Sequence, residues 1–505
     1  MIQILWVPVA STFSLILFLR YFCRSRFIKP IGVIAALLST LFTLIFFISD
    51  QITGEGITEA TLFHLTYGLS GLNPLNFPFE LAFVSGTLLL MTAALAAALF
   101  RTREGRLNRL SLPVEATILG FLVCFSVAVH PTVLEINHFL RKSWSPSAHS
   151  LNDELAGIDG LSHQDGPPKN LVYLYVESVE RLFLDDRVFP GLAGGLRTLE
   201  QDSLSIRGIR QAPMTDWTIA GMVASQCGVP LATFKPNRND LGDVESFVPG
   251  VTCLGDILTW FGYRNVYLGG ADLHFAGKQR FYPDHGVKEI FGVDELQALH
   301  GGRLPTSRWG VYDDTLLQTA FDKFRELSAG EQPFALFLLT LDTHPPRGHE
   351  TPSCKSIRYG EGGYAMLNAV HCADRLVSEF VTRIEDYAAE QRSENELVVI
   401  VASDHLMMHN EISPILDEHR GQRENLWLAR SAELEPGVVQ REATTLDIAP
   451  TVLSLLGWDV ESMALGRNLL KPAPTLIERY GQARFFTMLQ HWRLNLWKTW
   501  VPSTE

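Results

Sequence analysis

Four apolar segments near the start of the chain are each long enough to cross a lipid bilayer, and they constrain the fold more than any other feature. They cover residues 1–19, 31–49, 81–100 and 116–134. A helix needs about 20 apolar residues to cross the hydrocarbon core. The first segment has neither a preceding basic region nor a small-residue cleavage site, so we interpret it as a span rather than a signal peptide. We therefore predict a four-helix membrane domain over residues 1–136.

The distribution of basic residues orients these spans. Lys and Arg gather in the stretches that join the first span to the second and the third to the fourth, namely Arg20, Arg24, Arg26, Lys29, Arg101, Arg103, Arg106 and Arg109. Residues 51–79 contain neither. Because cytoplasmic loops carry the excess of basic residues, both Arg-rich loops are expected inside the cell. Everything after about Pro131 is then expected outside.

The external part of the chain is acidic. Residues 1–131 carry eight Lys/Arg and six Asp/Glu, so the remainder accounts for more than the whole formal net charge of −13. An acidic surface repels nucleic acid, and we therefore expect no nucleic-acid partner.

The cysteines fit an external, oxidising compartment. Of the six, Cys23 and Cys124 belong to the membrane region, which leaves an even number outside. Proximity in sequence favours two disulfides, Cys227–Cys253 and Cys354–Cys372. A zinc site is a poorer interpretation because no C-x-x-C spacing occurs.

Apolar strands that end in polar residues recur after a polar, Pro- and Ser-containing linker at 137–169. The predicted strands are 171–176, 265–268, 334–341 and the β-branched run from residue 398, and polar or glycine residues follow them at 177–178, 269–270, 342–344 and 403–405. In open α/β sheets, ligands gather at the carboxyl ends of strands. The repetition predicts one site at one edge of a mainly parallel sheet. An isolated Asp-His pair such as Asp404-His405 is more often structural than a ligand pair, so this inference needs the other strand ends.

The segment 213–228 predicts a helix that begins close to Thr215 and ends at Gly228. A hydroxyl at a helix N-terminus most often caps the helix. The same position suits a phosphate group, because free backbone N–H groups and the positive end of the helix dipole meet there. The local pattern leaves both interpretations open.

The last segment, 471–505, interleaves basic and aromatic residues and predicts an amphipathic helix. Such a helix lies either on the membrane surface or against the neighbouring domain.

Several motifs in order give the external part a family resemblance. They are NLVYLYVESVER (170–181), the Thr215 segment through ASQCGVP (224–230), WGVYDD (309–314), LDTH (341–344), SDH (403–405) and DIAPTVLSLLG (447–457). Residues 170–470 thereby resemble the sulfatase-like phosphoglycerol transferases, in particular the phosphoglycerol transferase I family that modifies periplasmic glucans. Lipoteichoic acid synthases are more distant relatives within the alkaline phosphatase superfamily. The resemblance implies an α/β catalytic domain of the sulfatase type, in the periplasm of a bacterial inner-membrane protein.

The resemblance also implies a metal site. Carried over residue by residue, it assigns Glu177, Thr215, Asp404 and His405 to one divalent ion. Mn²⁺ is favoured by the lipoteichoic acid branch, with Zn²⁺ or Mg²⁺ as alternatives, and a mixed oxygen and imidazole set is compatible with each. Thr215 is implied to be the nucleophile, since metal coordination makes a hydroxyl reactive at neutral pH.

The implied reaction has two displacements. Thr215 attacks the phosphorus of phosphatidylglycerol, diacylglycerol leaves, and an acceptor hydroxyl of a periplasmic glucan attacks the glycerophospho-threonine that remains. His344 is implied to act as general acid and base. Phe275, Lys278 and Trp309 are implied substrate contacts.

Two other interpretations remain open. Within the same chemistry, the chain is a phosphoethanolamine transferase or extends a polyglycerolphosphate polymer, which different lipid donors would distinguish. From another class, it is an inactive sulfatase-like module that binds glycan, which the intact set of Glu177, Thr215, Asp404 and His405 disfavours.

Overall fold

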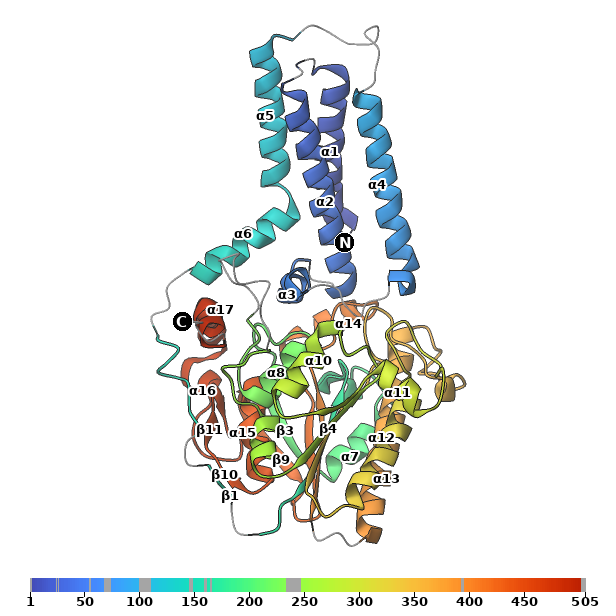
Figure 1. Ribbon diagram of the computed structural model, residues 1–505, viewed down its shortest axis with the longest axis vertical. Helices are drawn as coiled ribbons and strands as arrows, with labels where there is room; N and C mark the ends of the chain where they lie inside the picture. Colours follow the sequence, from blue (N-terminus) through green and yellow to red (C-terminus); the bar gives the residue numbers. More distant parts are fainter. Residues whose placement is uncertain are drawn as a thin grey trace. The chain divides into compact units, whose positions relative to one another are not determined.

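The computed structural model of the chain describes residues 2–23, 25, 27–53, 56–67, 74–99, 110–144, 149–158, 161–163, 166–232, 247–391 and 395–500. The chain forms two compact units (Figure 1). The first consists of Met1–Thr61 and Asn73–Ser145, and the second of Leu62–Leu72 and Pro146–Glu505.

The first unit is helical. Its helices are α1 (Ile2–Tyr21), α2 (Lys29–Thr53), α4 (Pro78–Leu99), α5 (Leu112–Ala128) and α6 (Pro131–Trp144). Helix α1 lies against α2, α4 and α5, and Leu19, Leu95 and Leu119 are buried in a common apolar core. Many other large apolar side chains of these helices are exposed, including Trp6, Leu90 and Phe121. Exposed apolar surface of this extent is typical of helices that face lipid.

The expected fourth span, 116–134, is not one continuous helix. Helix α5 ends at Ala128, α6 begins at Pro131, and the two helices meet at a bend of 62°. Proline at 131 has no N–H to donate to the preceding turn and its ring clashes there, so the helix breaks. By length and composition, α2 and α4 each suffice to cross a membrane, and α5 with α6 form a third candidate. The apolar part of α1, Trp6–Tyr21, is shorter than the usual length of a span.

The second unit is built on a mainly parallel eight-stranded sheet, which confirms the predicted α/β class. The strand order is β5-β4-β6-β2-β7-β8-β3-β9. Only β8 runs antiparallel to its neighbours β7 and β3. The strands are β2 (Asn170–Val176), β3 (Leu204–Arg210), β4 (Arg264–Gly269), β5 (Glu289–Phe291), β6 (Phe334–Leu339), β7 (Leu397–Ser403), β8 (Trp427–Arg430) and β9 (Gly437–Thr444).

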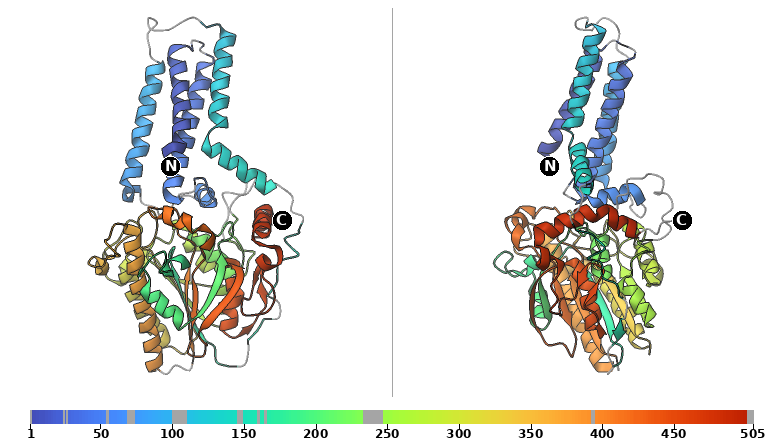
Figure 2. Two further views of the ribbon diagram at one scale, coloured as in Figure 1. Left: turned by 180° about the vertical axis from the view of Figure 1, so that it is seen from behind. Right: turned by 90° about the vertical axis from the view of Figure 1, so that its left-hand side faces the viewer.

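Helices cover both faces of this sheet (Figures 1 and 2). The helices of eight residues or more that lie wholly or mostly in this unit are α3 (Glu59–Tyr67), α7 (Gly194–Gln201), α8 (Thr218–Cys227), α12 (Asp313–Ser328), α13 (Ala365–Gln391), α15 (Ile448–Leu455) and α17 (Gln482–Trp500). The shorter ones are α9 (Leu254–Trp260), α10 (Lys278–Asp284), α11 (Val293–Leu299), α14 (Ser413–Glu418) and α16 (Leu476–Tyr480).

The central strand β2 is buried on both faces, as its continuous apolar run predicts. Successive side chains of a strand point to opposite faces. Val172 and Leu174 accordingly belong to the core under α7, α12 and α13. On the other face, the rings of Tyr173 and Tyr175 stack at 4.3 Å, and the Tyr175 hydroxyl lies 2.7 Å from that of Ser225 on α8. The sheet edge that carries the site is therefore fixed from both sides.

The flanking segments add ordered elements. Within 137–169, β1 (Ser162–His163) pairs with β10 (Trp458–Asp459), and β11 (Ser462–Met463) pairs with β12 (Gly466–Arg467) further along the chain. After residue 471, α16 and α17 follow each other, and α17 lies across one end of this unit (Figure 2). Within its own unit, Trp492 Nε1 donates to the carbonyl oxygen of His149, and Arg493 Nε donates to the sulfur of Met214.

Both expected disulfides, Cys227–Cys253 and Cys354–Cys372, are present in the structure. The first joins the last residue of α8 to the residue before α9. It therefore links two helices on the same face of the sheet.

Replacing Gly221 by Ala should destabilise the second unit. An added Cβ would lie 1.9 Å from the backbone oxygen of Asp404, which cannot move without shifting the end of β7. We expect a loss of about 1–3 kcal/mol, the usual cost of overpacking, seen as a lower midpoint of thermal unfolding. The control is Gly421→Ala, where no atom lies within 4 Å. Equal unfolding midpoints for the two variants would contradict the close approach.

Candidate active site

The carboxyl ends of three adjacent parallel strands bring the predicted acids and histidines to one edge. Glu177 follows β2, Asp404 and His405 follow β7, and His344 lies five residues after β6 ends. Because β6, β2 and β7 are neighbours and run in one direction, these residues share the same edge.

Glu177, Asp404 and His405 form a compact buried cluster. One potential ligand atom from each lies within 4.8 Å of the others. The Nε2 of His405 is 3.3 Å from Asp404 Oδ2 and 3.4 Å from Glu177 Oε1. All three residues are at most 1% exposed. The structure thus unites three of the four predicted ligands.

Local hydrogen bonds orient each member of this cluster. The backbone N–H groups of Ser178 and His405 donate to Asp404 Oδ1, and the Ser178 hydroxyl donates to Glu177 Oε1. Ser178 reaches both acids because its φ of 56° lies in the left-handed region. His405 Nδ1 lies 2.8 Å from the carbonyl oxygen of Leu406, so this nitrogen carries the proton. Nε2 then faces the two acids, and its lone pair becomes available to a cation once Nε2 has lost its proton.

The donor set fits a divalent cation. Asp404 Oδ2 and His405 Nε2 are buried and make no hydrogen bond, although they lie 3.3 Å apart as an ion pair. Buried polar atoms without a partner are costly unless a ligand satisfies them. Two carboxylates and one imidazole are ligands that Mn²⁺ and Zn²⁺ share. We infer that Glu177, Asp404 and His405 would hold such an ion.

The charges of these three residues depend strongly on one another. Burial and the nearby Glu177 carboxylate raise the pKa of Asp404 to about 8. Burial opposes the ionisation of Glu177, but His344 and His405 lower the pKa of Glu177 to about 2. Burial would also lower the pKa of His405, yet the Asp404 and Glu177 carboxylates raise it to about 10. Without a cation, Asp404 and His405 therefore hold protons at neutral pH.

Thr215 is buried near this cluster, but not at the start of a helix. Helix α8 begins at Thr218, three residues after Thr215, and ends at Cys227 with Gly228 as its cap, so the expected helix is present. Met214 has a φ of 64° and Trp217 is extended, and neither conformation continues a helix. The Thr215 hydroxyl donates to the carbonyl oxygen of Ala212 at 2.8 Å. Helix capping by Thr215 is therefore excluded, and Gly221 lets α8 approach both Thr215 and Asp404.

The predicted substrate contacts lie together beside His344. The rings of Trp309 and His344 have centroids 4.1 Å apart, and those of Phe275 and Trp309 are 5.8 Å apart. Lys278 donates from Nζ to the carbonyl oxygen of Phe275 at 2.8 Å. Burial lowers the pKa of Lys278 to about 8, although Glu177 and Asp404 oppose this shift. The structure therefore groups all three predicted contacts with the predicted acid–base residue.

Burial also lowers the pKa of His344 below the usual value for histidine. The Nδ1 atom lies 2.8 Å from the carbonyl oxygen of Pro345, which fixes the orientation of the ring. A buried imidazole with a lowered pKa gives up a proton readily and can act as an acid–base group near neutral pH.

A pair of buried acids supports the turn that carries His344. Asp313 accepts hydrogen bonds from the N–H groups of Leu341 and Asp342, at 2.7 and 3.0 Å, and Asp342 accepts one from the N–H of Asp313. The sequence motif WGVYDD identified Asp313 as a residue of interest. It did not predict that Asp313 binds the turn that carries His344. The supporting contacts of Ser178 and of Thr218, whose hydroxyl lies 3.4 Å from Glu177 Oε2, carried no sequence signal either.

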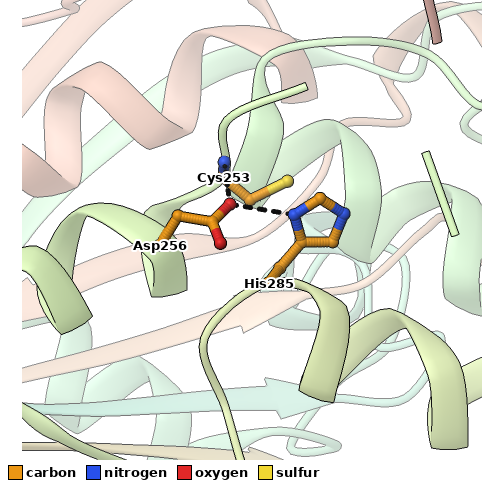
Figure 3. Close-up of side chains that lie close together, drawn as sticks. All are labelled: Cys253, Asp256 and His285. Atoms are coloured by element: carbon orange, nitrogen blue, oxygen red, sulfur yellow. Dashed lines mark hydrogen bonds and ion pairs between the residues drawn. The ribbon is translucent and has the colours of Figure 1, made fainter. Parts of the chain in front are cut away.

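A second cluster of potential ligands, Cys253, Asp256 and His285, has a structural explanation (Figure 3). The sulfur of Cys253 is bonded to Cys227. Asp256 accepts hydrogen bonds from the N–H of Cys253 and from His285 Nδ1, and His285 Nε2 lies 2.9 Å from the carbonyl oxygen of Phe247. These contacts use both imidazole nitrogens to fix the start of α9.

Comparison with known proteins connects both units to one group of enzymes. Residues 3–146 match the family described as phosphoglycerol transferase I, N-terminal domain, and residues 225–458 match the family described as sulfatase. The chain is 37% identical over 424 residues to a phosphoglycerol transferase I of Xanthomonas euvesicatoria pv. vesicatoria, covering 83% of this chain and 59% of the relative. It is 36% identical over 431 residues to one of Escherichia coli, covering 84% and 54%.

The chain thus spans little more than half the length of these curated relatives. Among solved structures, a protein of the alkaline phosphatase superfamily from Vibrio parahaemolyticus has a TM-score of 0.51. It is 22% identical and covers 69% of this chain and 79% of its own. This likeness supports the fold alone.

Metal binding should release protons and strengthen with pH. Ligation requires the loss of about two protons, one from Asp404 and one from His405, so affinity for Mn²⁺ should rise up to about a hundredfold per pH unit below about pH 8. Calorimetry in buffers of different ionisation enthalpy measures the proton count. Asp404→Asn should bind more weakly and release one proton fewer, whereas the exposed control Asp417→Asn should match the parent chain. A pH-independent affinity would contradict this assignment.

Asp313→Asn should impair turnover more than metal binding. The amide that replaces the carboxylate presents a donor to one of two backbone N–H groups, so the turn that carries His344 loses a hydrogen bond. We expect kcat to fall about 10–100-fold, as is usual for residues that orient a reacting group, while Mn²⁺ affinity changes little. Asp322→Asn, on the exposed face of α12, is the matched control. Parent-like kcat for Asp313→Asn would refute the supporting role.

Proposed function

We propose that this chain is a sulfatase-like phosphoglycerol transferase of the kind its curated relatives represent, and that it transfers sn-glycerol 1-phosphate from phosphatidylglycerol to a periplasmic glucan. The donor is a membrane lipid and the acceptor a soluble glycan. The proposal includes four membrane spans in the bacterial inner membrane, with the sulfatase-like domain in the periplasm. The printed name of the curated relatives, phosphoglycerol transferase I, supports the transfer of a phosphoglycerol group.

The observation that carries the proposal is the buried cluster of Glu177, Asp404 and His405. Its unsatisfied atoms point to one cation beside Thr215, His344 and Lys278. An inert glycan-binding module has no need for a costly buried group of this kind. We therefore favour the enzyme over the binding module.

Thr215 is the proposed nucleophile. Its oxygen forms a bond to phosphorus, the bond from phosphorus to the diacylglycerol oxygen breaks, and the Thr215 proton is lost to solvent. His344, in its protonated form, gives a proton to the departing oxygen and becomes neutral. The proposed product of this step is a glycerophospho-threonine and free diacylglycerol.

The second displacement returns the chain to its starting state. His344, now neutral, removes the proton of a glucan hydroxyl, whose oxygen bonds to phosphorus. The bond between phosphorus and Thr215 breaks, and Thr215 regains a proton. Lys278 places a buried positive charge where the phosphodiester carries its negative charge.

A bound Mn²⁺, the favoured ion, or Zn²⁺ or Mg²⁺ would supply Lewis-acid chemistry and make the Thr215 hydroxyl more acidic. Glu177, Thr215, Asp404 and His405 are its proposed ligands.

Incubation with phosphatidylglycerol should leave a glycerophosphate group on Thr215. Because the acceptor completes turnover, the adduct should accumulate when glucan is withheld, and mass spectrometry of the peptide containing residue 215 should detect it. Thr215→Ala should form no adduct, while Thr198→Ala, on the exposed side of α7, should behave like the parent chain. A phosphoethanolamine adduct from phosphatidylethanolamine would instead identify the alternative donor. Diacylglycerol release without any adduct would refute the proposed nucleophile.

A further inference from the structure

A short segment from the N-terminal part of the chain belongs structurally to the α/β unit. Leu62–Leu72 groups with the sheet, whereas the chain on either side of it, Met1–Thr61 and Asn73–Ser145, groups with the helical unit. This segment contains most of α3 and lies between two expected spans in the sequence. Residues 51–79, which include this segment, contain no Lys or Arg, so the segment is expected on the external side of the membrane.

Phe63 anchors this segment. It is only 2% exposed, and its ring centroid lies 4.8 Å from that of Trp217 and 6.2 Å from that of Phe247. Gly277, with φ of 77°, leaves the necessary space, since a Cβ there would come within 2.7 Å of Phe247 and 3.5 Å of Phe63. The anchor therefore contacts the chain two residues after Thr215.

His64, the next residue, extends a row of rings toward the metal cluster. Its imidazole stacks on Phe275 with centroids 5.0 Å apart and an angle of 18°. From Phe275 the row continues through Trp309 to His344, with centroid distances of 5.8 and 4.1 Å. His64, Phe275 and Trp309 are half-buried, while His344 is buried at the inner end. The row forms one continuous wall beside the reacting groups.

The chemistry of this wall suits a glycerophosphodiester. Stacked rings present flat apolar surface to the carbon atoms of glycerol, and Lys278 beneath Phe275 attracts a phosphate. Imidazole can donate a hydrogen bond to phosphate or hydroxyl oxygen in either protonation state. His64 stands at the end of the row furthest from His344, where a head group longer than phosphate alone would extend.

We propose that His64, held in place by Phe63, contacts the head group of the lipid donor and helps select it; this inference rests on the proposed function. The donor is favoured over the glucan because the segment between two expected spans is tied by its own chain to the bilayer surface. A lipid head group is concentrated there, whereas a soluble glycan is not. His64 acts as a specificity-determining residue rather than an acid–base group.

The test uses the full chain in nanodiscs that contain phosphatidylglycerol. His64→Ala should raise KM for phosphatidylglycerol about tenfold, the cost of one hydrogen bond of about 1.4 kcal/mol, with kcat and Mn²⁺ affinity little changed. His64→Gln retains an N–H donor and should recover part of the loss.

His274→Ala is the matched control. His274 is one residue from Phe275 but its side chain is 53% exposed and bonded to Asp272, outside the row. Thermal unfolding of each variant separates a binding effect from a loss of structure. Equal KM values for His64→Ala and His274→Ala would overturn the proposal, and so would a rise in KM for glucan alone.

Failure of the proposed function has a different signature. If the parent chain does not consume phosphatidylglycerol, that function is refuted, and retention of the lipid measured by native mass spectrometry then decides the role of His64. Loss of the retained phosphatidylglycerol in His64→Ala, but not in His274→Ala, would support the contact. Equal retention would overturn it.

Discussion

The structure depends on a concentration of negative charge that its own sheet keeps away from water. Glu177 and Asp404 lie within a few ångströms of each other, both almost fully buried, at the ends of adjacent strands. Two ionised carboxylates cannot coexist in such a place without a positive partner. His405 supplies part of that charge, and a divalent cation would supply the rest. The surrounding N–H groups, the left-handed turn at Ser178 and the close approach of α8 all maintain this arrangement.

A row of aromatic rings extends to one side of the cluster formed by Glu177, Asp404 and His405. Trp309 and Phe275 extend from His344 along one side, and Lys278 lies below them. A phosphodiester bound there would have its charge beside the cation site and its carbon skeleton against the rings. This division between charged and apolar recognition fits a lipid head group better than inorganic phosphate, which has no apolar part.

Much of this architecture could be predicted from the sequence because it follows from simple periodicities. The buried strands β2, β6 and β7 are continuous apolar runs, and parallel neighbours must place Glu177, His344 and Asp404 at one edge. The start of α8 could not be predicted, because the backbone conformations of Met214 and Trp217 outweigh the helical pattern around Thr215. Pro131 could be seen in the sequence, but the apolar run continues on both sides of it, so the mean hydropathy of 116–134 still indicates one continuous span. His64 was missed because its contacts with Phe275 join segments more than two hundred residues apart.

The order of strands in the sheet also governs how such a chain must be made. Strand β7 pairs along its whole length with β2, although β3, β4, β5 and β6 lie between them in sequence. A nascent chain delivered across a membrane from its N-terminus would expose β2 long before its partner arrived. Glu177 can therefore meet Asp404 and His405 only after β7 has been delivered, because these two residues follow that strand.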